Sequence, residues 1–238
     1  MEKIKEVFLN SIDSIKENRI NLFRGLLVPM LIMVGISVYF PILIKSLDMN
    51  MIIILSIVYP IFYFILYVVC FIQISRIVLL NEEKSFLSFL SWGKKEFMFV
   101  FYAGLITFAS ALIVGISLPF FNFEQIFLSV IPLSVIFLVL YTIPRFILLF
   151  PATAVEKYIS LKESWNLTED NKFLMIFTCW LLPIFFTVPI FLLLSILPLV
   201  LLQTLSVLTM IATVSFSAEA YKLIIVQNLD SLVEKEVK

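Results

Sequence analysis

The side chains that could do chemistry are few in this sequence, and their types exclude most catalysis. The chain has no histidine and two cysteines, which excludes Ser–His nucleophile pairs, HExxH zinc sites and Cys/His zinc clusters. Its five glycines form no GxxxxGK[ST] or GxGxxG loop for a nucleotide phosphate. No aspartate or glutamate lies in the middle of a long apolar run, so an intramembrane aspartyl protease or a proton relay is not indicated. We therefore expect no catalytic residue, no metal site, no cofactor and no enzymatic activity.

The remaining candidates are charged residues at the ends of apolar runs. Arg76, Arg145 and Lys222 each lie at such an end, and Glu219 lies one helical turn before Lys222. At a membrane boundary, such charges pair with each other, extend to water or bind lipid phosphate. We predict boundary ion pairs or lipid-phosphate contacts for these four residues. For Arg145 we favour a carboxylate partner, either Glu219 or Glu156.

Helices in a bilayer must position these charges. The chain is 62% hydrophobic and 14% charged, whereas soluble domains are roughly 45–50% apolar and about 25% charged. Its longest uncharged run, Phe173 to Ala218, has 46 residues, enough for two spans with a turn near Ser195–Pro198, because proline does not continue a helix. The predicted fold class is all-α, a polytopic membrane protein with six transmembrane helices and cytosolic amphipathic helices.

The predicted organisation follows from these runs. A cytosolic amphipathic helix occupies residues 1–24, a membrane domain occupies 25–226, and a cytosolic tail occupies 227–238. The spans are expected at about 25–44, 51–75, 98–120, 126–146, 172–195 and 198–221.

Lysine and arginine indicate the orientation. Of the 17 basic residues, all but Lys45 fall on one side of the predicted spans. By the positive-inside rule, both termini and the two longer loops face the cytosol.

Amphipathic stretches precede the predicted hairpins. The one at the N-terminus carries an apolar stripe of Ile4, Val7, Phe8, Ile12 and Ile15. Such a helix lies on the lipid headgroups or against the bundle, and the sequence leaves both open.

A repeat is indicated by landmarks around the boundary cations. Arg76, Arg145 and Lys222 are each followed by three apolar residues, and a Ser-Trp pair ending in Trp92 or Trp165 follows the first two. This pattern favours a three-fold repeat of an interfacial helix plus a transmembrane hairpin, with both tryptophans as interfacial anchors. The alternative is that the positive-inside rule places a cation at any cytosolic helix end.

Two expectations concern local packing. Small residues on one face of span three, namely Gly104, Thr107, Ala111 and Gly115, predict that this face turns into the bundle. Thr168 is expected to cap the helix of span five with its hydroxyl.

A family resemblance is visible in the second half of the chain. The stretch Pro144–Ala152, then Ala154–Lys157, then Lys162–Thr168 resembles the YciC-like bacterial inner-membrane proteins. It is also similar to the membrane domain that anchors some glycerophosphodiester phosphodiesterases. The resemblance covers most of the chain, with Ser-Trp-x-Leu-Thr its most specific element, and it implies a six-span protein of the bacterial inner membrane. The chain ends at Lys238, so we expect no catalytic domain like that of the anchored enzymes.

Two functions of different classes are consistent with this sequence. The first is a non-catalytic integral inner-membrane protein in envelope maintenance or lipid-contacting scaffolding, whose partners are membrane lipids and not nucleic acid. The alternative is a small permease or transporter subunit for an apolar or zwitterionic solute. A transporter should have a cavity reaching past mid-membrane, lined by Gln73, Thr107, Ser110 or Gln203.

Overall fold

The structure, a computed structural model that describes residues 2–120, 126–192 and 197–236, is helical almost throughout. Within these ranges, six helices are long and apolar enough to cross a membrane. This confirms the predicted all-α, six-span fold class. The first three spans are α2 (Arg19–Ile44), α3 (Met49–Leu80) and α4 (Lys94–Ser117).

The fourth and fifth spans are less regular, and prolines account for the breaks. The fourth is built from α5 (Ile126–Thr142), a 3-10 turn η3 (Ile143–Phe146) and α6 (Leu149–Ala154). The fifth joins α8 (Lys172–Ile176), a π-helical turn η5 (Phe177–Leu181) and α9 (Leu182–Leu192). The sixth lies in α10 (Leu199–Glu236), so most of the predicted tail continues this helix. The predicted turn near Ser195 falls on 193–196, outside the described residues.

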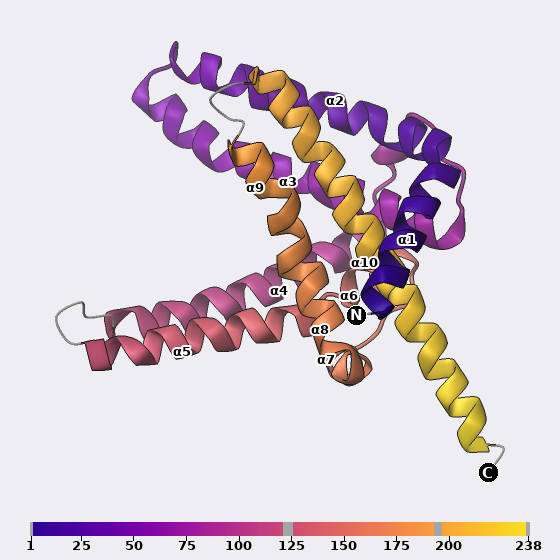
Figure 1. Ribbon diagram of the computed structural model, residues 1–238. Helices are drawn as coiled ribbons and strands as arrows, with labels where there is room; N and C mark the ends of the chain where they lie inside the picture. The colour runs from indigo at the N-terminus through magenta and orange to yellow at the C-terminus, as the bar shows by residue number, and fades with distance from the viewer. Residues whose placement is uncertain (1, 121–125, 193–196, 237–238) are drawn as a thin grey trace.

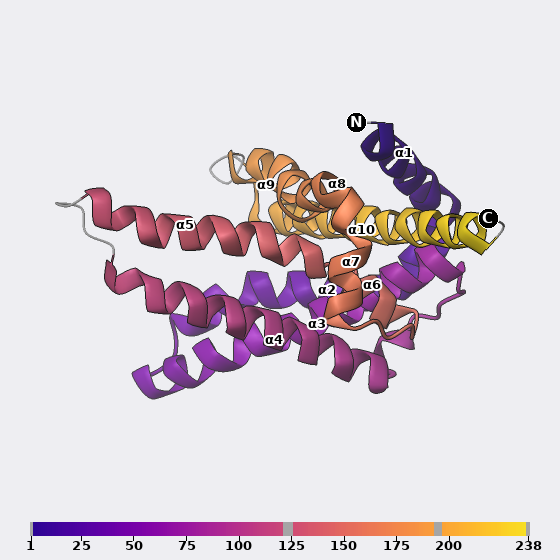
Figure 2. The same ribbon diagram turned by 90° about the horizontal axis from the view of Figure 1, so that it is seen from below.

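Three hairpins, α2–α3, α4–α5 and α9–α10, diverge from a common end of the molecule, which we call the base (Figure 1). The short helices α1 (Glu2–Glu17), α6 and α7 (Leu161–Leu167) lie at the base. In Figure 1 the α4–α5 hairpin points left, whereas α2, α3 and α9 rise toward the upper left. Figure 2 shows from below that all three hairpins run from the base in the same general direction.

The buried core lies where the hairpins converge. α3 is buried over much of Leu66–Val78 and exposed over most of its other half, and it packs against α10. α1 also packs on α10, with Val7 fully buried and the Phe8 ring 6.4 Å from that of Phe216. The amphipathic N-terminal helix therefore lies against the bundle, which decides between the two positions that its sequence left open.

The small-residue face of span three is not turned into the bundle, contrary to expectation. Gly104, Thr107, Ala111 and Gly115 are all exposed, and a Cβ added at either glycine would meet no atom within 4 Å. The close helix approach occurs instead at Gly25 of α2, where an added Cβ would lie 3.2 Å from the Gln73 side chain. Small residues mark a face that permits close approach, but they do not require a partner to be there.

Candidate functional site

Arg76 forms the centre of an ion-pair network at the base. At the end of α3, its guanidinium donates to Glu82 in the following loop and, at 2.8 Å, to Glu156 just after α6. Lys84 pairs with Glu82 at 2.7 Å, and Lys95 of α4 lies 3.7 Å from Glu156. Burial alone would raise the pKa of Glu82, but the hydrogen bonds from Arg76 and Lys84 outweigh it, so this pKa is lowered. The network joins the base ends of α3, α4 and α6.

Arg145 is 2% exposed and does not pair with the expected carboxylates. Its guanidinium donates to the Trp165 carbonyl at 3.2 Å and to the Tyr141 hydroxyl at 3.3 Å, and it lies 4.2 Å from the centre of the Trp165 ring. Among the described residues, no carboxylate lies within 4.0 Å of this side chain. The prediction of Glu219 or Glu156 as partner was wrong because each of these carboxylates has other partners. The Nε of Arg145 is buried and has no hydrogen-bond partner among the described residues.

The Ser-Trp-x-Leu-Thr element, residues 164–168, also contacts the backbone of Arg145. The Ser164 hydroxyl donates to the Arg145 carbonyl at 2.8 Å, and the Thr168 hydroxyl lies 3.5 Å from the same oxygen. Thr168 also donates to the Ser164 carbonyl at 2.9 Å, at the end of α7, so it does not cap span five as expected. These contacts fasten α7 to the turn η3, where Pro144 interrupts regular helical bonding.

Glu219 and Lys222 contribute to the attachment of α1. Glu219 is 3% exposed, accepts a hydrogen bond from Ser14 of α1 and lies 3.8 Å from Lys222. Lys222 itself is largely exposed, unlike Arg76 and Arg145. Trp92 is half exposed, whereas Trp165 stacks on Arg145. The order of short helix and hairpin recurs along the chain, but the landmark residues of the predicted repeat have different environments.

A central cavity of about 260 Å³ lies where the three hairpins converge. Residues of α3, α4, η3, α6, η5, α9 and α10 form its walls. Its aromatic wall consists of Phe64, Tyr67, Phe71, Phe99 and Phe150. Three of these rings pack together. The distance between ring centres is 4.9 Å for Phe71 and Phe99 and 4.7 Å for Phe99 and Phe150.

The polar atoms of this cavity are hydroxyls and a thiol, and no lysine, arginine, aspartate or glutamate lines it. Thr178 donates to the Leu174 carbonyl at 2.7 Å, and Thr213 donates to the Thr209 carbonyl at 3.0 Å. The Ser217 hydroxyl is buried without a hydrogen-bond partner in the part of the chain that the structure describes. Ser217 was not among the residues predicted from the sequence, because a serine in an apolar helix more often bonds its own backbone.

The turn η5 places Thr178 and Cys179 on the cavity wall. Pro183 has no N–H, and its ring would clash with the Cys179 carbonyl in a regular helix. The helix adjusts by a π-helical turn in which the Leu182 N–H donates to the Phe177 carbonyl. The position of Pro183 is the sequence signal that could have indicated this turn.

Trp180 of the same turn joins the third hairpin to the second. Its indole N–H donates at 2.7 Å to the Leu140 carbonyl of α5. That carbonyl lies four residues before Pro144 and therefore cannot receive the usual helical hydrogen bond. In a membrane, freed carbonyls need such a partner.

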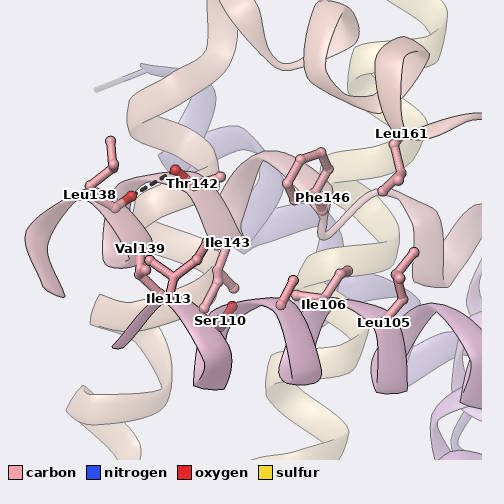
Figure 3. Close-up of a pocket in the computed structure, with 11 residues that line it drawn as sticks. Leu105, Ile106, Ser110, Ile113, Leu138, Val139, Thr142, Ile143, Phe146 and Leu161 are labelled. Atoms are coloured by element: carbon pink, nitrogen blue, oxygen red, sulfur yellow. Dashed lines mark hydrogen bonds between the residues drawn. The ribbon is translucent and has the colours of Figure 1, made fainter. Parts of the chain in front are cut away.

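A second apolar groove, of about 360 Å³, lies between α4 and the α5–η3 segment (Figure 3). Leu105 and Leu161 lie at one end of it, and Ile113 and Leu138 lie at the other. The Thr142 hydroxyl on its wall donates to the Leu138 carbonyl at 2.7 Å. The groove is suited to hydrocarbon.

The residues expected to line a transport path do not come together. Thr107 and Ser110 line a shallow cavity along α4. Gln73 is buried beside Gly25 at the contact of α2 with α3, and Gln203 lies near the start of α10. Neither glutamine lines that cavity, the central cavity or the α4–α5 groove.

Comparisons with known proteins add no functional assignment. The chain matches no protein-family model, no curated protein and no solved structure. Among the described residues, no group of three or more cysteines and acidic residues is placed to hold a metal ion.

Proposed function

We propose that this chain is a non-catalytic integral protein of the bacterial inner membrane that holds lipid between its hairpins, as a lipid-contacting scaffold of the envelope. The observation that carries the proposal is the central cavity, which residues of all three hairpins line and no charged residue lines. The resemblance to the YciC-like proteins supports the choice of membrane, and the distribution of lysine and arginine supports cytosolic termini.

The surroundings of the cavity favour hydrocarbon as its occupant. Most of the cavity wall is apolar, so it offers water few of the two to four polar partners that water needs. In a bilayer the molecules at its openings are acyl chains, so no transfer from water drives binding. The gain comes from filling a space whose walls otherwise lack contacts on one side.

The base supports a scaffold rather than a catalyst. Arg76, Arg145 and Glu219 each have partners that join separate elements. Charges that are engaged in this way hold the hairpin ends together. A lipid-modifying enzyme would instead need free polar groups converging at one membrane face.

Filling the cavity tests the proposal. Ala103→Trp on α4 and Thr213→Phe on α10 each place a large side chain on the wall. We expect either variant to co-purify with at least one fewer lipid per protein, counted by mass spectrometry of the intact complex. Leu112→Trp, at an exposed position of α4 that lines none of the described cavities, is the control and should retain the wild-type number. Equal lipid content in all four proteins would contradict the proposal.

A further inference from the structure

Ser217 is a buried polar group without a partner on the wall of the central cavity. It is 3% exposed, and its hydroxyl has no hydrogen-bond partner among the described residues. A buried hydroxyl left unpaired is costly, and each such group calls for an explanation such as a bound molecule. Because Ser217 lines the cavity, an occupant of the cavity can supply the missing partner.

The neighbouring hydroxyls define which groups an occupant can offer. Thr178 and Thr213 already donate to carbonyls of their own helices, so they retain only acceptor capacity. Ser217 retains both a donor and acceptors. The Tyr67 hydroxyl, also on the wall, is a donor and an acceptor too. The cavity can therefore receive a carbonyl, through Ser217 or Tyr67, or a hydroxyl, through any of the four.

The absence of charge on the wall restricts the occupant further. A carboxylate, a phosphate or an ammonium group placed here would be buried without a lining counter-charge, which is strongly unfavourable. The charges of the base do not change this. Arg76 is paired with Glu82 and Glu156, and Glu219 lies beside Lys222. Arg145, which has no carboxylate partner among the described residues, does not line the cavity. The chemistry of the cavity thus selects a neutral head.

We propose that the central cavity binds a neutral lipid with one hydroxyl or carbonyl group, which forms a hydrogen bond with Ser217 while its hydrocarbon lies against the ring cluster of Phe71, Phe99 and Phe150. This inference rests on the proposed function and deepens it, because it names the chemical class of the lipid. Charged phospholipids remain outside the cavity, around the hairpins.

Three ten-carbon probes test the class of ligand on the purified full chain in detergent. They are 1-decanol, decane and decanoate, and their binding is measured from the concentration-dependent rise in unfolding temperature. In the wild type we expect 1-decanol to bind more tightly than decane, after the binding of each is corrected for its partitioning into micelles. Decanoate at neutral pH should bind no more tightly than decane. Because partitioning is the same for every variant, comparing variants cancels it.

A matched pair of serines isolates the hydrogen bond. Ser217→Ala should weaken 1-decanol binding about fivefold, the ratio that one net hydrogen bond provides, and leave decane binding unchanged. Ser215→Ala is the control, because Ser215 is also a buried, unpartnered serine of α10 but does not line the cavity. It should bind both probes as the wild type does.

The outcomes separate this inference from the proposed function. Loss of 1-decanol and decane binding in Ala103→Trp, with no effect of Ser217→Ala, would overturn the hydroxyl contact and leave the lipid-holding cavity intact. Tighter binding of decanoate than of 1-decanol would overturn the neutral class. If Ala103→Trp binds 1-decanol and decane as tightly as the wild type does, both proposals are overturned.

Discussion

Arg145 illustrates at the residue scale how a boundary charge is held without a counter-charge. Its side chain stacks on Trp165 and donates to a backbone carbonyl, and its own carbonyl accepts from Ser164. The sequence identified this cation and the Ser-Trp-x-Leu-Thr element separately. The contact between them could not be predicted, because it depends on how the chain turns between η3 and α7. In that segment Glu156 has a positive φ of 62°.

Arg145→Lys should destabilise the protein by about 1–2 kcal/mol, because lysine reproduces neither the planar stacking nor the forked donors. Denaturant unfolding in detergent measures this loss. In a double-mutant cycle, we expect Arg145→Lys to couple by about 0.5 kcal/mol or more with Trp165→Leu and not with Glu219→Gln. Coupling with Glu219 instead would show that a carboxylate holds the guanidinium after all.

Glu82 provides a pH-dependent contribution to stability. Its pKa is lowered from the ordinary 4.5 in the folded protein. The ionised carboxylate therefore stabilises the fold at any pH above the ordinary pKa of 4.5. This stabilisation is lost as the pH falls through the lowered pKa of the folded protein. Glu82→Gln should lower the free energy of unfolding by at most about 1 kcal/mol at pH 7, because the ion pairs are partly exposed. The difference from wild type in unfolding temperature should narrow as the pH falls below 4.5.

Glu83→Gln is the control for this measurement, because Glu83 is an exposed neighbour without an ion pair among the described residues. A difference that stays constant from pH 7 down through the acid range would argue against the charge of Glu82 as its source.

At the scale of elements, hydropathy predicted the six spans but not which helix faces meet. In soluble proteins an apolar face indicates the core, but in a bilayer the lipid is equally apolar, so composition does not distinguish the two sides of a helix. The small face of span three was therefore assigned to the bundle incorrectly, and the close approach at Gly25 was missed. Pro144 and Pro183 determine which carbonyls lose their helical partners, whereas the helices continue through Pro29, Pro60, Pro132 and Pro189.

The two glycines give opposite expectations. Gly25→Leu should destabilise the protein by about 1–3 kcal/mol, because a Cβ there already lies 3.2 Å from both the Gln73 and Lys84 side chains. Gly104→Leu should change stability much less, because its added Cβ meets open space. We expect the unfolding temperature to fall more in Gly25→Leu than in Gly104→Leu. A larger loss for Gly104→Leu would mean that the face of span three has a partner.

At the scale of the whole molecule, the hairpins converge at the base and diverge away from it, and the basic residues of the sequence gather at the base end. Single cysteines report the orientation in a variant with Cys70 and Cys179 replaced by alanine. Ser85→Cys, in the exposed loop at the base, should not react with an impermeant thiol reagent added outside intact cells. Ser46→Cys, exposed in the turn between α2 and α3, should react. The reverse labelling would place the base outside the cell.

Photo-crosslinking can locate lipid in the space where the hairpins converge. The purified protein is incorporated into vesicles that contain a neutral lipid with a diazirine in its acyl chain, illuminated, and mapped by peptide mass spectrometry. We expect crosslinks to Ala103, Phe150 and Val214, which line the central cavity from three elements, and we expect these crosslinks to be lost in Thr213→Phe. Crosslinks confined to exposed side chains such as Phe137 and Phe185 would show that lipid stays outside the cavity.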